Sequence, residues 1–204
     1  MSIKKNKVRF DEFYACELLK LFLPESCNEL KVVDKPDLQS KKFNVEVTSI
    51  QDDYQASINA VIKKRLFSRS ENPKLDLYLE QNGVEFKDGE ILLTQEKNID
   101  LKNVLSTIIE KKMCKSYIKR CDALFFINYC YARKKSKEDI KSIVNSIISI
   151  YKNYDNSFKY IFLLYDENNF CYYNLETNMI TYKYIDRKQQ MLIRYKYYKE
   201  TEND

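Results

Sequence analysis

Two carboxylates, Asp37 and Glu46, lie nine residues apart near the start of the chain. Glu46 belongs to the run Phe43–Ser49, in which apolar and polar residues alternate as they do on a half-buried strand, so Glu46 and Thr48 share one side. A turn over the polar residues Gln39–Lys42 would fold Asp37 back against this strand. Two carboxylates at a strand end suit Mg²⁺ or Mn²⁺, and such a site can hydrolyse phosphodiester bonds.

Two other charged residues fall on the apolar faces of predicted helices, where a charge needs a partner. Glu17 lies in the middle of the apolar stripe of a helix predicted over Val8–Leu23. Lys112 lies on the apolar face of a helix predicted over Asn98–Lys119. Each has two interpretations that the sequence leaves open. Glu17 is either paired with a lysine or a third acid of the metal site, and Lys112 either extends its ammonium to water or serves that site.

The arrangement resembles the PD-(D/E)XK nuclease superfamily, whose members share the restriction-endonuclease-like fold. In that pattern Pro36 and Asp37 are the PD pair and Glu46 is the acidic residue. Thr48 stands where the motif has lysine, so the chain departs from the family pattern at this position. The resemblance covers residues 8–129 and implies a metal-dependent nuclease.

The resemblance also implies roles for the remaining residues. The main-chain carbonyl of Val47 would join the two carboxylates in holding Mg²⁺ or Mn²⁺. Glu17 would bind the cation directly or through water, because the superfamily often carries a glutamate on its first helix. Lys112 would supply the positive charge that Thr48 lacks, and Thr48 would hydrogen-bond the attacking water.

The absence of histidine excludes several classes of catalytic site. A chain of 204 residues without histidine cannot build a Ser-His-Asp or Cys-His catalytic group, an HNH-type nuclease site or a zinc deaminase centre. The six cysteines form no CxxC pair, which disfavours zinc and fits buried thiols in a reducing cytoplasm. A net charge of +5 permits nucleic-acid binding but does not require it.

Helices and strands alternate along the chain. Helices are predicted over Val8–Leu23, Gln51–Phe67, Asn98–Lys119 and Ile140–Tyr151. Strands are predicted over Leu30–Val33, Phe43–Ser49, Leu75–Leu79, Ala123–Tyr129, Tyr160–Tyr165, Phe170–Asn174 and Ile180–Ile185, with a hairpin over Val84–Leu93 that turns at Asp88 and Gly89. This order predicts an α/β fold. With the resemblance, it implies a restriction-endonuclease-like mixed β-sheet core flanked by helices, with a strand-rich C-terminal extension.

Size and hydropathy point to a single domain spanning residues 1–204, without a signal peptide. We expect no membrane contact, because no apolar run approaches the roughly 20 residues needed to cross a bilayer. Near the end of the chain, Met191–Tyr198 interleaves aromatic residues with lysines, a pattern that can stack bases, although tyrosine is abundant throughout the sequence.

Two functions from different classes remain open. The first is a cytoplasmic metal-dependent nuclease acting on DNA in preference to RNA, with a homodimer suggested by resolvase-like relatives. The second is a catalytically inactive nuclease-fold protein that binds nucleic acid or a protein partner, such as a phage or defence-related regulator. Thr48 favours the second function. The retained acids, Asp37, Glu46 and Glu17, favour the first, because buried carboxylates without a cation repel one another.

Overall fold

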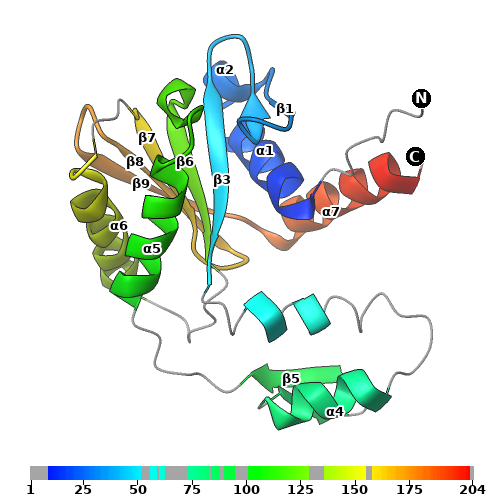
Figure 1. Cartoon of the computed structure of the whole chain (residues 1–204). Helices are drawn as coiled ribbons and strands as arrows, with labels where there is room; N and C mark the ends of the chain where they lie inside the picture. The colour runs from blue at the N-terminus through cyan, green and yellow to red at the C-terminus, as the bar shows by residue number, and fades with distance from the viewer. Residues whose placement is uncertain are drawn as a thin grey trace, which may run out of the picture.

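A seven-stranded mixed sheet forms the centre of the molecule (Figure 1). The computed structural model describes residues 9–51, 56–58, 60–62, 73–82, 84–87, 90–94, 101–128, 136–154 and 158–202. In spatial order, the strands are β1 (Lys31–Val32), β2 (Leu38–Gln39), β3 (Asn44–Ile50), β6 (Ala123–Asn128), β7 (Tyr160–Leu164), β8 (Asn169–Asn174) and β9 (Met179–Tyr184). β3, β6 and β7 run parallel, and the other neighbouring strands are antiparallel.

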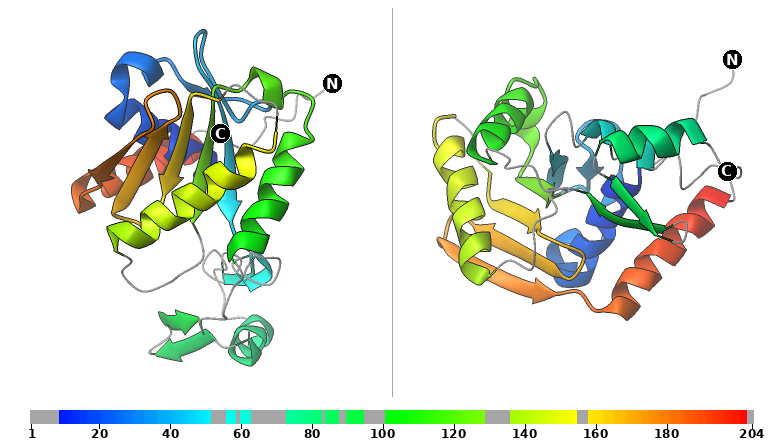
Figure 2. Two further views of the ribbon diagram at one scale, coloured as in Figure 1. Left: turned by 90° about the vertical axis from the view of Figure 1, so that its left-hand side faces the viewer. Right: turned by 90° about the horizontal axis from the view of Figure 1, so that it is seen from below.

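Helices cover both faces of this sheet, so the expected α/β class with a mixed sheet is confirmed (Figure 2). The helices are α1 (Phe10–Phe22), α2 (Pro24–Cys27), α4 (Pro73–Gln81), α5 (Leu101–Met113), α6 (Lys137–Tyr151) and α7 (Arg187–Glu202), with a 3₁₀ turn, η1 (Ile118–Arg120). α1 and α7 contribute to the core on one face, and α5 and α6 to the core on the other.

β6 shows why the sheet is covered on both sides. Ala123, Phe125 and Ile127 point into the core shared with α1 and α7. Leu124 and Phe126 point into the core shared with α5 and α6. Since successive strand residues face opposite sides of a sheet, a continuously apolar strand must be buried on both. The strand predicted over Ala123–Tyr129 is confirmed for residues Ala123–Asn128.

The first three strands form an antiparallel meander, and α5 then leads to β6, which returns parallel to β3. In the register of these two strands, Glu46 lies beside Leu124 and Thr48 beside Phe126. Leu124 and Phe126 face α5 and α6, so Glu46 and Thr48 face the same side. The alternating pattern of β3 thus places the acid of the motif next to α5.

The C-terminal strands follow the sequence prediction closely. A turn around Asn178 joins β8 to β9, and Asn178 has a φ of 55°, in the left-handed region that asparagine tolerates better than most residues. α6 begins earlier than predicted, at Lys137, because Ser136 and Asp139 form a reciprocal capping box at its start. The strand-rich C-terminal part of the prediction is correct, except that α7 follows it.

Two predicted elements differ from the structure, and one segment without a predicted element is helical. Leu75–Leu79, predicted as a strand, lies in α4, because leucines four residues apart fit a helix as well as an alternating strand and Pro73 suits a helix start. The predicted helix over Asn98–Lys119 is shorter, since α5 ends at Met113 and a turn leads to η1. Met191–Tyr198, which the sequence left without an element, lies within α7.

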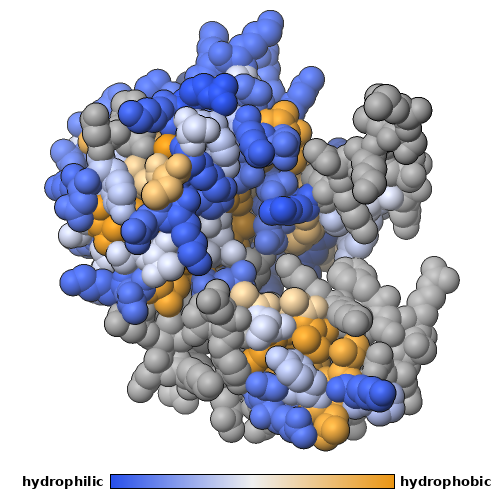
Figure 3. Space-filling model, viewed as in Figure 1, coloured by the Kyte–Doolittle hydropathy of each residue, from blue (hydrophilic) through white to orange (hydrophobic). Residues whose placement is uncertain are grey.

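The α4, β4 (Val84–Lys87) and β5 (Glu90–Thr94) segment has a small core of its own. Buried Ile58, Leu79 and Val84 form this cluster. The predicted hairpin is confirmed, with β4 antiparallel to β5. Figure 3 shows hydrophobic residues on this unit at the lower right, in keeping with the exposed Leu77. Most of the helix predicted over Gln51–Phe67 lies outside the described residues, although residues 56–58 and 60–62 are helical.

The cysteines are mainly buried, as the sequence suggested. The buried thiols are Cys16, Cys27, Cys121 and Cys171, whereas Cys114 is exposed and Cys130 lies outside the described residues. Burial raises the pKa of the Cys171 thiol to about 12, so this group stays protonated and unreactive. Among the described helices, none has the length and apolar character to cross a membrane.

Candidate active site

The edge of β3 is where the site begins. β2 pairs only with the first residues of β3, matching Leu38 with Val45 and Gln39 with Asn44. Beyond these two residue pairs, Asp37 contacts β3 with its side chain: its Oδ2 accepts a hydrogen bond of 2.8 Å from the main-chain N–H of Val47. The predicted turn therefore does bring Asp37 back against the strand that carries Glu46.

Glu46 is the most enclosed member of the site. Its side chain is 0% exposed, and Oε1 accepts three hydrogen bonds, from Lys112 at 2.6 Å, Lys115 at 2.9 Å and the hydroxyl of Tyr117 at 3.1 Å. The other oxygen, Oε2, is buried without a hydrogen-bond partner. A buried oxygen with no partner costs about 1–3 kcal/mol, more when it carries charge, so Oε2 suits a further cation.

Lys112 links the strand edge to Glu46. Its Nζ donates to Oε1 of Glu46 at 2.6 Å and to the main-chain carbonyl of Val47 at 2.7 Å. It also lies 3.9 Å from Oδ2 of Asp37. Three of the four groups predicted to hold a metal therefore surround one point, and an ammonium group lies there. Of the two interpretations of Lys112, the structure supports a place in the site.

The two carboxylates have pKa values shifted in opposite directions. Burial raises the pKa of Glu46, but the charges and hydrogen bonds of Lys112 and Lys115 outweigh burial and hold it below its ordinary value. Burial and the nearby charge of Glu46 raise the pKa of Asp37, and the effects of Lys112 and the Val47 N–H only partly offset this. Glu46 is thus the firmly ionised member, and Asp37 holds its charge at a cost.

Lys115 and Tyr117 were not predicted as site residues. Both come from the turn after α5, and Lys115 Nζ lies 5.4 Å from the centre of the Tyr117 ring. Burial lowers the pKa of Lys115, but its hydrogen bonds to Glu46 and Tyr117 outweigh this and raise it overall. The lysine-rich end of the helix, followed by tyrosine, was the signal in the sequence that could have identified them.

A hollow of about 150 Å³ opens beside the strand edge. It is lined by Arg9, Asp11, Glu12, Val47, Thr48, Ser49, Lys112 and Ile127. Thr48 thus reaches the site as its alternation with Glu46 predicted. The first turn of α1 forms the opposite wall, and this turn carries two acids, Asp11 and Glu12. The hollow lies next to the point where Lys112 meets the carboxylates.

Glu12 is the acid of α1 that faces the site. Burial raises the pKa of Glu12 and the charge of Asp37 raises it further, whereas Arg9, 3.6 Å away, and more weakly Lys112 act in the opposite direction. Its side chain is only 14% exposed. The helical pattern places Glu12 opposite the apolar stripe that holds Glu17, where a solvated side chain is expected, but the structure buries it. Glu12 shares its side of α1 with Ala15 and Leu19, both fully buried, so the helix is buried on two faces.

Glu17 has a different environment. Its Oε1 accepts a hydrogen bond of 2.9 Å from Lys20, and its Oε2 one of 2.6 Å from Lys196 on α7. Burial raises the pKa of Glu17, but the two lysines outweigh it and lower the pKa overall. The structure therefore supports the lysine-paired interpretation of Glu17, between α1 and α7, and not the place of a third acid in the site.

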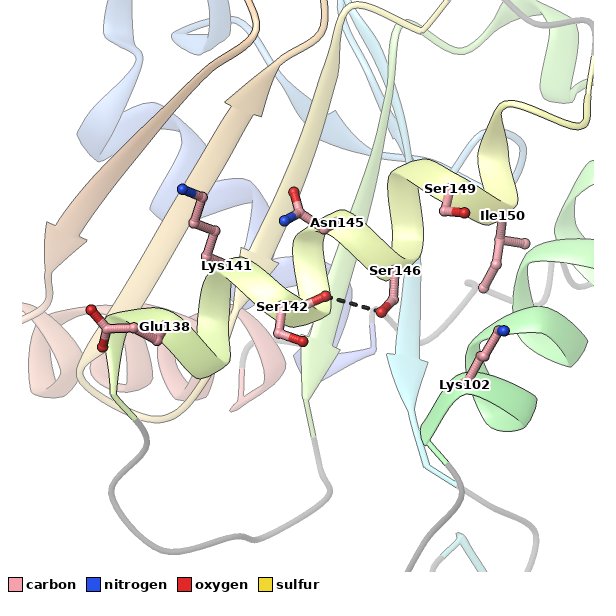
Figure 4. A pocket seen from close by; sticks show the side chains of 8 residues that line it. All are labelled: Lys102, Glu138, Lys141, Ser142, Asn145, Ser146, Ser149 and Ile150. Carbon is pink, nitrogen blue, oxygen red and sulfur yellow. Dashed lines mark hydrogen bonds between the residues drawn. The ribbon is translucent and has the colours of Figure 1, made fainter.

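A larger hollow, of about 520 Å³, lies along the outer side of α6 near the start of α5 (Figure 4). Its polar side chains come from successive turns of α6 and point in different directions, with Lys141 and Asn145 on one side and Ser142 and Ser146 on another. Ser146 turns back to donate to the carbonyl of Ser142 at 3.0 Å. Because these groups do not converge, size alone does not make this hollow the reactive site.

The residues at the β3 edge fit a divalent cation. In the part of the chain that the structure describes, no three His, Cys, Asp or Glu side chains form a metal-binding group by themselves. Two carboxylates and a main-chain carbonyl are nevertheless an adequate set for Mg²⁺, which usually keeps several waters and takes one or two protein carboxylates. The unpartnered Oε2 of Glu46 adds a further acceptor at this place.

Comparison with known proteins gives no match to a family model, to a curated protein or to a solved structure.

Proposed function

We propose that this protein is a metal-dependent nuclease of the PD-(D/E)XK type, hydrolysing phosphodiester bonds of DNA in preference to RNA. The observation that carries the proposal is the convergence of Asp37, Glu46 and the Val47 carbonyl on one point, held by the ammonium of Lys112. A helix, an antiparallel meander, a second helix and a parallel strand, in that order, are what this superfamily implies. This order supports the proposal.

Asp37, Glu46 and the Val47 carbonyl would hold Mg²⁺ or Mn²⁺. The chemistry supplied by the bound cation would be activation of water and neutralisation of the charge that develops on the phosphate. The N–H of Val47 fixes the Asp37 carboxylate, since it donates to Oδ2 at 2.8 Å. Lys115 and Tyr117 fix Glu46 through Oε1 and leave Oε2 without a protein partner.

Lys112 carries the positive charge that the motif expects two residues after the acid, where this chain has Thr48. Its Nζ reaches both carboxylates from α5, across the sheet edge. A cation at this point can stabilise the charge that develops on a phosphate, and such preorganised groups are among the largest contributions to catalysis. Glu12, on the opposite wall of the hollow, would orient water or the cation.

The second function is an inactive nuclease fold that binds nucleic acid or a protein partner. One observation favours it, because Lys112 and Lys115 already neutralise Glu46 without a metal. The carboxylates therefore do not require a cation for the chain to fold. Against it stands Asp37, which keeps a costly charge beside Glu46 although an asparagine could accept the same hydrogen bond from Val47.

Cleavage of a panel of single-stranded and double-stranded DNA and RNA, with Mg²⁺ or Mn²⁺, tests the proposal. Wild type and Glu46→Ala are compared at equal concentrations of folded protein. The proposal expects metal-dependent cleavage by wild type that Glu46→Ala lacks. If wild type, shown to be folded, cleaves nothing in the panel, the binding function takes its place.

A further inference from the structure

The outward side of α7 exposes four large apolar residues in one stripe. Met191 is 61% exposed, Leu192 54%, Tyr195 56% and Tyr198 51%. Their spacing of three, four and seven positions places them on one side of a helix. The opposite side, with Gln190 and Ile193, is buried. Isolated exposed apolar residues are ordinary, but a continuous stripe marks a surface that a partner covers.

Lysines border this stripe. Lys188 and Lys199 project from the same side of the helix as Tyr195, and Lys199 Nζ lies 5.2 Å from the centre of the Tyr195 ring. We call these two lysines and the four apolar residues the Tyr–Lys face. α7 carries five basic residues against two acidic ones. Arg194 and Lys196 are paired with Glu167 and Glu17. The Tyr–Lys face itself carries Lys188 and Lys199.

The side of α7 opposite the Tyr–Lys face packs on α1, the helix whose first turn lines the hollow. Tyr197, on the inner side of α7, packs its ring against Phe10 at 5.1 Å and Phe13 at 5.4 Å, both on α1. The first turn of α1 carries Glu12, which lines the hollow with Lys112. Figure 1 shows α7 lying along α1. A polymer held at the carboxylates would have to pass around α7 to reach the Tyr–Lys face.

Charge and area decide between two occupants of this face. A second copy of the chain would bring two basic helices together, and like charges repel. The four half-exposed side chains would also bury only roughly 400 Å², against about 800 Å² per partner in a typical stable interface. A single-stranded polynucleotide offers phosphates to the lysines and base faces to the tyrosines, which is how such strands are bound without sequence preference.

We propose that the Tyr–Lys face of α7 binds a single-stranded polynucleotide that extends from the carboxylate site. The inference rests on the proposed function, because that function explains why a polynucleotide is present. From Lys188 to Tyr198 the face spans about 15 Å, enough for a few stacked bases. Tyr195 and Tyr198 stack on bases, and Lys188 and Lys199 contact phosphates. The substrate class is therefore a strand with an unpaired segment.

The test measures fluorescence anisotropy of labelled oligonucleotides of about 15 nucleotides, a length that matches known single-strand site sizes. Single-stranded DNA, single-stranded RNA and a DNA duplex are compared in EDTA, so that no cleavage occurs. The variants are Tyr195→Ala/Tyr198→Ala and, as the conservative pair, Tyr195→Phe/Tyr198→Phe. Tyr78→Ala, which removes an exposed tyrosine of α4, is the matched control.

The alanine pair should weaken single-strand binding at least tenfold, because each stacked base depends on its ring. The phenylalanine pair and Tyr78→Ala should bind within about twofold of wild type. Lys188→Gln/Lys199→Gln should lower the slope of log affinity against log salt by about 1.4, or 0.7 for each phosphate contact. Unchanged binding by the alanine pair would overturn the inference.

Two further results separate this inference from the proposed function. If wild type cleaves and the alanine pair binds and cleaves equally well, the proposed nuclease function stands and the inference about the Tyr–Lys face is rejected. If wild type binds through the Tyr–Lys face but never cleaves, the inference is supported and the proposed nuclease function is rejected. Sedimentation velocity of the same proteins tests whether a second copy of the chain occupies the face. If wild type is a dimer and the alanine pair is a monomer, the occupant is a second copy and the inference is overturned.

Discussion

The Nζ atom of Lys112 lies 2.6 Å from Oε1 of Glu46, although 66 positions separate the two residues in the chain. Glu46 comes from β3, and Lys112 from the last turn of α5, the helix that leads to β6. Their meeting depends on the parallel pairing of β3 with β6, which sets α5 against the face that carries Glu46. In the proposed site, Lys112 of α5 would supply the positive charge at the strand edge, where β3 itself carries Thr48.

Lys112→Met should abolish cleavage and leave the fold intact. Methionine retains the apolar stem of the side chain but removes the charge near the phosphate, and a loss of about 100-fold or more in kcat is expected. The matched control is Lys111→Met, which alters the neighbouring exposed lysine of α5. Initial cleavage rates and melting curves are compared for both. Equal activity of Lys112→Met and wild type would exclude Lys112 from the reaction.

Asp37→Asn should stabilise the metal-free protein at neutral pH. The folded state raises the pKa of Asp37, so its ionised form costs stability above the unfolded pKa, and this cost disappears with the charge. The amide oxygen of asparagine can still accept from the Val47 N–H. The free energy of unfolding in EDTA should rise by about 1 kcal/mol. Urea denaturation measures it, with exposed Asp34→Asn as the unchanged control.

Adding Mn²⁺ tests whether Asp37 holds the cation. It should raise the melting temperature of wild type, because a ligand of the folded state stabilises that state. The same addition should leave Asp37→Asn nearly unaffected. A variant that is less stable than wild type in EDTA and keeps the full Mn²⁺ response would show that Asp37 is structural.

The pKa of Glu46 gives a pH dependence of opposite sign. Its folded pKa is lowered by Lys112 and Lys115 against the effect of burial, so ionised Glu46 stabilises the fold above its unfolded pKa. That contribution is lost as the pH falls through the folded value, below the ordinary 4.5. Glu46→Gln should cost about 2 kcal/mol at neutral pH, and the difference from wild type should shrink on acidification. Denaturation at a series of pH values measures it; a constant difference would contradict the ion pairs.

Glu12→Gln and Glu17→Gln should separate the two acids of α1. Glu12 lines the hollow, and the charge of Asp37 raises its pKa. Its replacement should lower the cleavage rate about tenfold or more with little change in melting temperature. Glu17 pairs with Lys20 and Lys196, so its replacement should cost about 1 kcal/mol of stability and leave the rate of the folded protein unchanged. The reverse pattern would restore Glu17 to the site.

Much of the sheet could be predicted from the sequence because its strands have clear patterns. Alternation identified β3 and placed Glu46 and Thr48 on one side, and a continuous apolar run identified β6. The charged residue on an apolar helix face identified Lys112, since a buried charge needs a partner. These local signals brought Asp37 and Glu46 together and marked Lys112 as a candidate, but the contact of Lys112 with Glu46 could be seen only in the fold.

The two acids of α1 could not be assigned in the same way. A helical wheel assumes one buried face, but α1 packs against the sheet on one side and against α7 on the other. The face of α1 that carries Phe10, Phe13 and Glu17 packs against α7. Glu17 therefore pairs with Lys196 of α7. Because α7 carries apolar residues on its exposed side as well as its buried side, the sequence lacks the helical period that would reveal it. Neither the helix nor its contact with α1 could therefore be predicted.

Titration of Mn²⁺ into the metal-free protein by calorimetry is the most direct test of the site. The central claim is that Asp37, Glu46 and the Val47 carbonyl hold a divalent cation at the point now held by the Lys112 ammonium. Wild type should bind Mn²⁺, Glu46→Ala should lose that binding, and Lys112→Met should bind more tightly, because it removes a competing positive charge. Absence of binding in wild type, or equal binding in Glu46→Ala, would contradict the claim.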